Sequence, residues 1–446
     1  LKRRTLLQGA LAGVVLSGCS REPVAPSVSP SNPFTVDGSA SVDVVITEEY
    51  GGFAAAAYRK KYAGATIAPK LTTQLSDDLL PRFATGTPPD VVLSTGDQKL
   101  TLGKLVKDGQ LAELEQLLDA PSWDDQEAKV KDQLLPDLLE VGQFDGTQRT
   151  LNYISSVYGI WYSASLFQRN GWDVPRTWPD LLALGSDMKA AGLGPFIYAG
   201  THPYYLLELV LTLAAKTGGP DVTKRIDNLE DGAWKDESVT KAINAVGELT
   251  KRGLLAPGTA QYDHLGSQKR FLASKAGMLP CGNWLENEMK GLVSDEFALT
   301  VFAVPALDAS PAMPSGLHVA GTAPFLVPDK AKNKAGGLEY LRALLSADVA
   351  RQVSSESKQL TIVRGAADGL ELTTALGSAR DLLSAAGDQI IKWYFDTWYP
   401  DFATTAAEAT GQFMAGGLQQ SEWAGRIQAA ADKVKQDAAV TKYHRD

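Results

Sequence analysis

Short apolar strands alternate with helix-like stretches through the first part of the chain, and this alternation limits the fold more than any other feature. Residues 41–47 form a β-branched run, residues 53–62 an alanine-rich stretch, and residues 90–94 a second apolar run after a helix predicted over 73–85. Short buried strands joined by helices are typical of a parallel, doubly wound α/β sheet. Such sheets bind ligands at the loops beyond the carboxyl ends of the strands. The loop residues that this rule selects are Glu48, Glu49, Tyr50, Ser94 and Asp97.

A second alternating region begins near residue 151 and predicts a second α/β unit. Its pattern predicts a helix over 237–251, and the C-terminal part of the chain is mostly helical in character. Thr177 and Asp180 have the spacing of a capping box, with Pro179 just inside the helix start. A length of 446 residues is enough for two or three domains. The expected strands of this region are residues 157–162, 194–198, 297–304 and 322–327.

The first residues resemble a secretory signal rather than part of a folded domain. Basic residues 2–4 precede an apolar stretch that ends in Leu-Ser-Gly-Cys at 16–19. The stretch is well short of the ~20 residues that a membrane-spanning helix needs, and its layout is typical of a secretory signal. Leu-Ser-Gly-Cys resembles the lipobox of bacterial lipoproteins, which implies a signal peptide over 1–18 and acylation of Cys19. The proline-rich residues 19–41 predict an extended tether. The paired arginines also resemble a twin-arginine signal, which leaves the export route open.

Composition and missing motifs exclude several classes of function. The formal net charge is −9, and removal of the three leader cations makes it −12, so no basic surface for nucleic acid is expected. Two cysteines and four scattered histidines predict no thiolate or histidine metal site. The sequence lacks G-x-x-x-x-G-K-[ST], a strand-borne G-x-G-x-x-G and G-x-S-x-G. We therefore expect no cofactor and no nucleic-acid partner, and we interpret Cys281 as a small buried residue.

The run from Gly282 to Glu286 is the sharpest candidate for ligand contact. An apolar stretch stops at Gly282, and Asn283 with Glu286 three residues later predicts a helix cap. Trp284 would then lie in the first helical turn, where an indole can cover the C–H face of a pyranose while amide and carboxyl groups bond its hydroxyls. The alternative is that Trp284 belongs to the core and its neighbours only cap the helix. The spacing alone does not decide between the two.

Aromatic clusters and further acids leave other possibilities open. Residues 152–162 favour cross-strand core packing, whereas residues 393–399 could line a groove or fix a helix. Glycoside hydrolysis needs two carboxyl groups about 5–10 Å apart, and Glu48 or Asp97 with Glu286 could supply them across a cleft. Recognition of hydroxyl or ammonium groups is the simpler use of the same carboxylates.

Several segments resemble the extracytoplasmic solute-binding proteins of bacterial carbohydrate ABC importers. Residues 152–178 look like that family's crossing into its second lobe, and residues 271–284 look like its ligand-loop motif. Within the family, residues 158–163, 284–290 and 321–328 are most similar to the branch that binds N-acetylglucosamine and chitobiose. The resemblance covers nearly the whole mature chain.

This resemblance implies a two-lobed clamp, in which each lobe is a doubly wound α/β sheet flanked by helices and the chain crosses the hinge several times. The sequence departs from the branch pattern at 281–283 and in the loop 201–205, which leaves the ligand itself open. The implied first lobe is residues 42–152 and 305–360, and the implied second lobe is residues 153–304 and 361–446.

The resemblance also implies a function and partners. The ligand is an amino sugar or a short chito-oligosaccharide held between the lobes, and the partner is the permease of an ABC importer. We expect a monomeric, non-enzymatic receptor that is lipid-anchored at the outer face of the cytoplasmic membrane. A secreted glycoside hydrolase and a clamp for glycerophosphodiesters are the alternatives. Family position selects Trp284, Asn283 and Glu286 as ligand contacts, to which the loop argument adds Glu48, Tyr50, Ser94, Asp97 and Tyr153.

Overall fold

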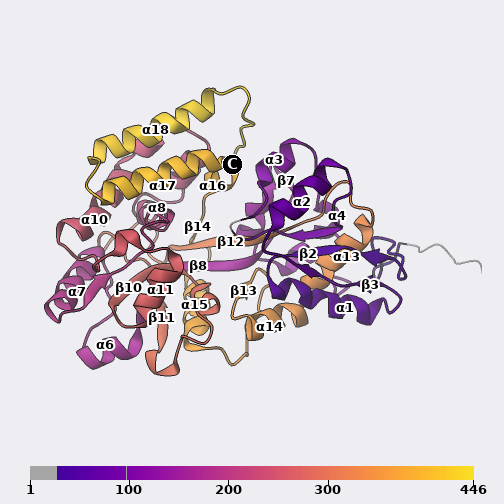
Figure 1. The fold of residues 1–446 in the computed structure, drawn as a ribbon, viewed down its shortest axis with the longest axis horizontal. Coiled ribbons are helices and arrows are strands. Elements are labelled where there is room, and N and C mark those ends of the chain that lie inside the picture. Colours follow the sequence, from indigo (N-terminus) through magenta and orange to yellow (C-terminus); the bar gives the residue numbers. More distant parts are fainter. Residues whose placement is uncertain (1–27, 97, 446) are drawn as a thin grey trace, which may run out of the picture.

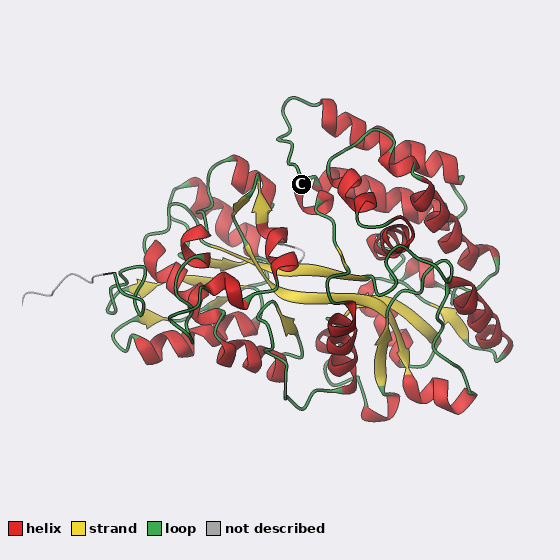
Figure 2. Cartoon of the chain, turned by 180° about the vertical axis from the view of Figure 1, so that it is seen from behind, coloured by secondary structure: helices red, strands yellow, loops and turns green. Residues whose placement is uncertain are grey.

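Two lobes lie side by side and are joined through the middle by two long strands (Figure 1, Figure 2). The computed structural model describes residues 28–96 and 98–445. Strands β8 (Leu151–Ser163) and β12 (Leu317–Leu326) run from one lobe into the other and pair antiparallel. The predicted two-lobed α/β fold is confirmed. The proposed signal peptide and Cys19 lie outside the described residues.

The first lobe is built on a mixed sheet in the order β4-β2-β5-β12-β8. Strand β2 is parallel to β4 and β5, whereas β12 is antiparallel to β5 and β8. All three residues of β2 are buried, because alternate side chains point to opposite faces and apolar side chains pack on both. Its strands and helices are β1 (Ser41–Val42), β2 (Val44–Ile46), α1 (Phe53–Lys61), β3 (Thr66–Ile67), β4 (Lys70–Leu71), α2 (Leu75–Ala84), β5 (Val91–Leu93), α3 (Leu102–Lys107), α4 (Glu115–Leu118), α5 (Pro136–Leu139), β6 (Gln143–Phe144), β7 (Thr147–Gln148), α13 (Lys334–Leu344), α14 (Ala347–Glu356) and β13 (Leu360–Thr361).

The second lobe continues the same sheet, with β10 and β11 on either side of β8 and β9 beyond β10. The prediction of a separate sheet in each lobe therefore needs adjustment, because β8 and β12 make one ten-stranded sheet of both. Its strands and helices are α6 (Ala164–Asn170), α7 (Trp178–Ala190), β9 (Gly194–Phe196), α8 (Tyr204–Gly218), α9 (Asp221–Asp227), α10 (Glu237–Lys251), α11 (His264–Leu272), β10 (Ala276–Gly282), α12 (Leu285–Glu288), β11 (Leu299–Phe302), α15 (Thr374–Ala386), β14 (Ile390–Ile391), α16 (Phe395–Trp398), α17 (Pro400–Met414) and α18 (Gln420–Gln436).

Local signals in the sequence set several element boundaries. The capping box predicted at Thr177 and Asp180 is present, since each side chain accepts a hydrogen bond from the backbone N–H of the other. Helix α10 has the predicted bounds. Cys281 is buried, as expected, and burial raises the pKa of its thiol well above the ordinary value.

The N-terminal tether prediction is wrong for the part of it that the structure describes. Phe34 and Val36 are buried in the core of the first lobe. The Asn32 side chain closes a loop by accepting from the Val36 N–H at 2.8 Å and donating to the Val36 carbonyl at 3.2 Å. Two apolar side chains among prolines and serines are enough to dock this segment, and the globular body therefore begins before residue 41.

The lobe boundary expected at residue 305 lies further along the chain. Residues 305–316 pack with the second lobe, because Ala306 bridges to Thr177 and the Met313 N–H donates to the Lys216 carbonyl at 3.1 Å. The return to the first lobe takes place within β12. The final crossing follows β13, which is close to the expected residue 361.

A buried lysine bridges the lobes beside the hinge. Lys392 follows β14, and its Nζ lies 2.7 Å from an oxygen of Asp137 in α5 and 2.7 Å from an oxygen of Glu140. Its partners belong to the first lobe, whereas β14 pairs with the second-lobe end of β12 at His318. This ion triad therefore connects the two lobes.

Both aromatic clusters contribute to the core. In the first, the Tyr158 hydroxyl donates to the Tyr205 carbonyl at 2.6 Å, and Trp161 Nε1 donates to the Cys281 carbonyl at 2.9 Å. In the second, Trp393 stacks on His318 with ring centroids 3.8 Å apart, and the cluster packs between β12 and the C-terminal helices.

Candidate functional site

The first lobe presents the ends of β2 and β5 toward the second lobe. The hydroxyls of Thr47 and Thr95, which follow these strands, are hydrogen-bonded at 2.5 Å and tie the two loops together. Ser94 is buried, and its Oγ accepts from the Leu100 N–H at 2.9 Å. The buried Ser94 side chain therefore stabilises the conformation of the loop after β5. Glu48 is half-buried at the same edge.

The two tyrosines predicted as ligand contacts lie inside the first lobe. Tyr50 and Tyr153 are both buried, with ring centroids 6.4 Å apart. The Tyr153 hydroxyl donates to the Leu344 carbonyl at 3.2 Å, and its ring meets Phe325 edge-on. Burial raises the pKa of both phenols. Their packing holds the loop after β2 against the hinge strand β8. Asp97, the remaining predicted contact of this lobe, lies outside the described residues.

Asn283 fixes the ligand loop of the second lobe to the hinge strand. Its Oδ1 accepts from the Val157 N–H at 3.1 Å, its own N–H donates to the Val157 carbonyl at 3.0 Å, and its Nδ2 donates to the Ser155 carbonyl at 3.4 Å. The predicted helix cap is wrong, because the residue at the N-cap of α12 is Trp284 and no side chain caps it. Asn283 is a buried connection between β10 and β8.

Trp284 and two tyrosines form an aromatic surface on the second lobe. The ring of Trp284 is half-buried and lies over the backbone of Gly282, where a Cβ would come within 1.9 Å of it. Tyr205 lies 6.1 Å from Trp284 between ring centroids and stacks on Tyr204 at 4.3 Å. Tyr204 is 40 % exposed. The sequence pointed to loop 201–205 only as a departure from the family pattern, and these two tyrosines were not predicted as contacts.

The acids of α12 point to different surroundings. Glu286 accepts a hydrogen bond from Thr373 Oγ1 at 2.8 Å, whereas Glu288 accepts from Gln268 Nε2 at 2.6 Å. Residues two apart on a helix are about 200° apart around its axis, which explains the divergence. Partial desolvation raises the pKa of both carboxyls, and Glu286 is half-buried whereas Glu288 is exposed. Sequence reasoning selected Glu286 and did not select Glu288.

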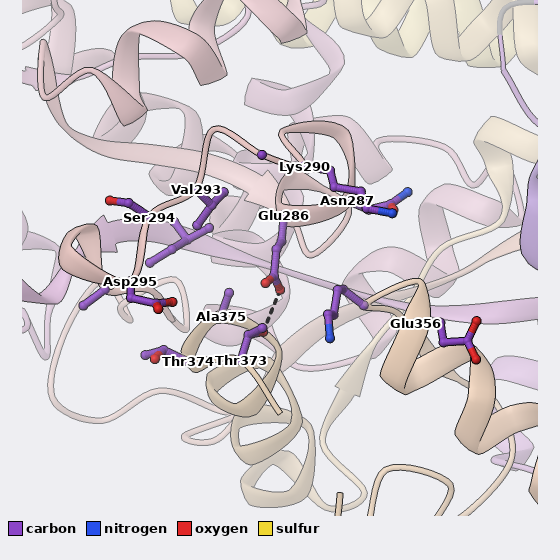
Figure 3. Close-up of a pocket in the computed structure, with 14 residues that line it drawn as sticks. Glu286, Asn287, Lys290, Val293, Ser294, Asp295, Glu356, Thr373, Thr374 and Ala375 are labelled. Carbon is purple, nitrogen blue, oxygen red and sulfur yellow. Dashed lines mark hydrogen bonds between the residues drawn. The ribbon is translucent and has the colours of Figure 1, made fainter. Parts of the chain in front are cut away.

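Glu286 points into a pocket of about 190 Å³ between α12 and the start of α15 (Figure 3). The hinge residues Glu356 and Lys358 close one side of the pocket, and Lys358 favours the ionised form of Glu286. Thr373 caps α15 while it donates to Glu286. This pocket borders the hinge, and nothing in it connects Glu286 to Glu48.

Glu48 instead lies within electrostatic range of Glu288 on the other lobe. Burial raises the pKa of Glu48, and the charge of Glu288 raises it further, whereas a hydrogen bond with Thr95 lowers it. The charge of Glu288 also raises the pKa of Tyr204 and Tyr205. Glu48, Glu288 and the aromatic surface therefore form one neighbourhood, which we call the interlobe cluster: Glu48, Thr95, Tyr204, Tyr205, Trp284 and Glu288.

A second acidic pair lies beside this cluster and was not predicted. Glu208, on α8, has an Oε2 atom that is buried and has no hydrogen-bond partner. Burial raises the pKa of Glu208 well above its usual range, and Asp396 raises it further. Trp393 Nε1 donates to Asp396 at 3.2 Å, and Lys99 of the first lobe favours the ionised form of Asp396. The region between the lobes is therefore rich in hydrogen-bond acceptors.

Two further observations concern the described residues only. No group of three or more His, Cys, Asp and Glu side chains there is arranged to hold a metal ion. None of their helices combines the length and the apolar character needed to cross a membrane.

Comparisons with known proteins agree with this architecture. Residues 43–351 match the model of the bacterial extracellular solute-binding protein family. The diacetylchitobiose binding protein NgcE of Streptomyces coelicolor is 32 % identical, and the alignment covers 99 % of this chain and 98 % of that protein. A solved chitin oligosaccharide binding protein has a TM-score of 0.71 at 16 % identity, covering 89 % of this chain and 99 % of its own.

A probable secreted solute-binding lipoprotein from Streptomyces coelicolor has a TM-score of 0.71 at 18 % identity, covering 87 % of this chain and 98 % of its own. At such identities the solved structures establish the fold alone. The family match and the full-length relative establish the relationship. The chain belongs to the bacterial extracellular solute-binding proteins.

Proposed function

We propose that this protein captures a chito-oligosaccharide or amino sugar between its lobes and delivers it to the permease of an ABC importer. The observation that carries the proposal is the interlobe cluster, in which Glu288, beside the aromatic surface of one lobe, lies within electrostatic range of Glu48 on the other. Flat apolar rings and hydrogen-bond acceptors are what a pyranose requires. The full-length similarity to a diacetylchitobiose binding protein supports the same ligand class.

Within this proposal the residues have different tasks. Trp284 and Glu48 contact the sugar, and Tyr204, Tyr205 and Glu288 join them. Asn283, Ser94, Tyr50 and Tyr153 act as positioning residues, because their polar groups or rings are occupied inside the fold. Glu286 borders the hinge pocket rather than the sugar. Asp97, which the structure does not describe, remains a candidate contact from the sequence.

Support for binding rather than hydrolysis comes from the carboxylates. The hydrolase alternative pairs Glu286 with a first-lobe acid, yet Glu286 is hydrogen-bonded to Thr373 and points into a pocket that Glu48 does not line. A phosphodiester ligand would favour basic side chains, whereas the interlobe cluster presents acids. Closure on a ligand requires that the closed form bind it more tightly than the open form.

Isothermal titration calorimetry of the purified mature chain tests the proposal. Diacetylchitobiose, N-acetylglucosamine, a neutral disaccharide and a glycerophosphodiester are titrated separately. Binding of the amino sugars with a Kd at least about tenfold below that of the neutral disaccharide supports the proposal. Tighter binding of the phosphodiester, or turnover of a chromogenic chitobioside, would replace it with one of the alternatives.

Membrane attachment through Cys19 is also part of the proposal. A protein monomer acylated there would keep its body at the outer face of the cytoplasmic membrane, since two acyl chains give lasting anchorage. The full-length chain is expressed in its bacterial host with an alkyne-tagged fatty acid. Labelling of the wild type and its loss in Cys19→Ala, together with release of the variant into the medium, is the expected result. Equal membrane retention of both forms contradicts the anchor.

A further inference from the structure

The segment that follows α18 connects the two lobes at a distance from the hinge strands. We call residues 437–445 the strap. In Figure 1 it runs from the end of α18 back to the neighbourhood of α16, where the second lobe meets the first. Its contacts with each lobe differ in kind, and together they indicate what the strap does.

Hydrogen bonds fix the strap to the second lobe. The Arg445 N–H donates to Asn228 Oδ1 at 2.8 Å, and Asn228 Nδ2 donates to the Arg445 carbonyl at 2.9 Å. The Arg445 guanidinium lies 2.8 Å from an oxygen of Asp227, whose side chain is fully buried. The Tyr443 N–H donates to the Tyr399 hydroxyl at 2.9 Å. The strap is therefore an integral part of the second lobe.

The same segment contacts the first lobe at two points. The ring of Tyr443 meets the ring of Phe144 edge-on, with centroids 5.2 Å apart, and the two residues are only 6 % and 2 % exposed. The Ala439 carbonyl accepts from Lys107 Nζ, at the end of α3, at 2.6 Å. Phe144 lies in the β6–β7 hairpin, which is hydrogen-bonded to the start of α4 in the first lobe. Separation of the lobes here would expose both rings to water, which is unfavourable.

Helix α16 and the Lys392 ion triad extend this contact. The ring of Trp398, in α16, lies 5.6 Å from that of Tyr443, and its Nε1 donates to the Gln143 carbonyl at 3.5 Å. Helix α16 also lies against α3. Arg445 donates to the Lys392 carbonyl at 3.1 Å, so the strap supports the residue whose ammonium group bridges the lobes. The strap, α16 and the triad thus form one continuous connection.

This connection borders the region in which the sugar is proposed to bind. Helix α3 follows the loop after β5, which carries Ser94 and Thr95. Helix α16 carries Asp396, which accepts from Trp393 Nε1. Because α3 and α16 are in contact, the position of that loop relative to the second lobe depends on whether the strap holds.

We propose that the strap fastens the second lobe to the first in the arrangement that binds sugar, so that the unliganded lobes are already held together. Its effect on affinity rests on the proposed function, whereas its effect on the shape of the molecule does not. The apparent affinity of a ligand falls in proportion to the fraction of molecules in the binding-competent arrangement. Loss of the strap should therefore weaken every ligand of the cleft by the same factor.

X-ray scattering and calorimetry on two variants test this inference. Phe144→Ala removes the first-lobe half of the aromatic contact and leaves the bonds of the strap to the second lobe intact. A chain that stops after Gln436 lacks the strap. Each variant without ligand should have a larger radius of gyration than the wild type, and saturating diacetylchitobiose should restore the wild-type value. The Kd should rise about tenfold, equally for diacetylchitobiose and N-acetylglucosamine, as expected for loss of one buried aromatic contact.

Phe167→Ala is the matched control. Phe167 is a buried phenylalanine that meets Trp172 edge-on at 5.9 Å within the second lobe. Its replacement should lower the Tm about as much as Phe144→Ala does and change neither the radius of gyration nor the Kd. Circular dichroism verifies that each variant is folded, and Phe144→Ala decides alone where the shortened chain does not fold.

The outcomes separate the strap from the proposed function. An unchanged radius of gyration in folded, unliganded Phe144→Ala overturns the inference, and so does an increase that saturating sugar does not reverse. If the wild type binds neither sugar, the proposed function is wrong, and the scattering of the unliganded chains alone decides whether the strap holds the lobes.

Discussion

Replacement of Trp284 by alanine should weaken sugar binding far more than it weakens the fold. One part of the ring is packed over Gly282 and against Tyr205, and the other part is free to meet a ligand. The two losses therefore appear in different measurements. Affinity reports the free face, and thermal stability reports the packed face.

The expected size of the effect follows from the area that a sugar would cover. If a pyranose buries about 80 Å² of the free face, about 25 cal/mol per Å² gives about 2 kcal/mol, or about thirtyfold in Kd. Loss of the packed face should cost about 1 kcal/mol and, in a chain of this length, lower the Tm by only about 1–2 °C.

Trp172→Ala is the matched control. Trp172 is also a half-buried tryptophan of the second lobe, and it meets Phe167 edge-on at 5.9 Å. Its replacement should lower the Tm by a similar amount and leave the Kd for diacetylchitobiose unchanged. Calorimetry and differential scanning fluorimetry measure both quantities on both variants. An unchanged Kd in Trp284→Ala would remove this residue from the site and refute the reasoning.

Three other changes have expected outcomes. Asn283→Ala leaves backbone groups of β8 without partners, so it should destabilise the protein by about 1–3 kcal/mol in chemical denaturation, and a cost below about 0.5 kcal/mol would contradict this role. Burial lowers the pKa of His318 to about 4. The unfolded chain therefore takes up a proton that the native chain does not as pH falls from about 6.5, and stability should fall by up to about 3 kcal/mol by pH 4. His318→Gln should flatten that part of the stability–pH curve, and an unchanged slope would assign the loss to other groups. Lys392→Ala breaks the interlobe triad and should shift the unliganded protein toward the open form by about 1 kcal/mol, seen as a larger radius of gyration in X-ray scattering; an unchanged radius would show that the triad does not hold the lobes together.

The sequence predicted those features that depend on neighbours in the chain. The strand–helix alternation, the Thr177 capping box and the bounds of α10 all follow from local patterns. Asn283 shows a case in which the local pattern gives the wrong prediction. Its spacing to Glu286 fits a helix cap, but its side chain forms hydrogen bonds with β8, which is distant in sequence. Hydrogen bonds to a distant strand therefore determine the position of this side chain, and the local spacing does not.

The candidate site was predicted only in part for the same reason. Trp284 and Glu48 could be selected from motif position and strand ends. The choice between Glu286 and Glu288 depends on how a single helical turn is oriented, which tertiary packing sets and local spacing does not. Tyr205 is contributed by a helix some eighty residues earlier, and only the folded lobe brings it to Trp284. The full length of β8 could not be predicted either, because a strand that is buried along its whole length shows no alternation of polar and apolar residues.

The position of β12 has a consequence for the order in which the chain can fold. This strand, residues 317–326, lies between β5 and β8 in the sheet of the first lobe. A nascent chain that has emerged only as far as β8 lacks the strand that joins its N-terminal half to the hinge, so that half cannot complete its core. Folding of the first lobe must wait until residue 326 is available, and closure of such a long loop is slow. The topology therefore keeps the first lobe unfolded during most of the synthesis of the chain. An unfolded polypeptide is the form that can pass through a narrow translocation channel.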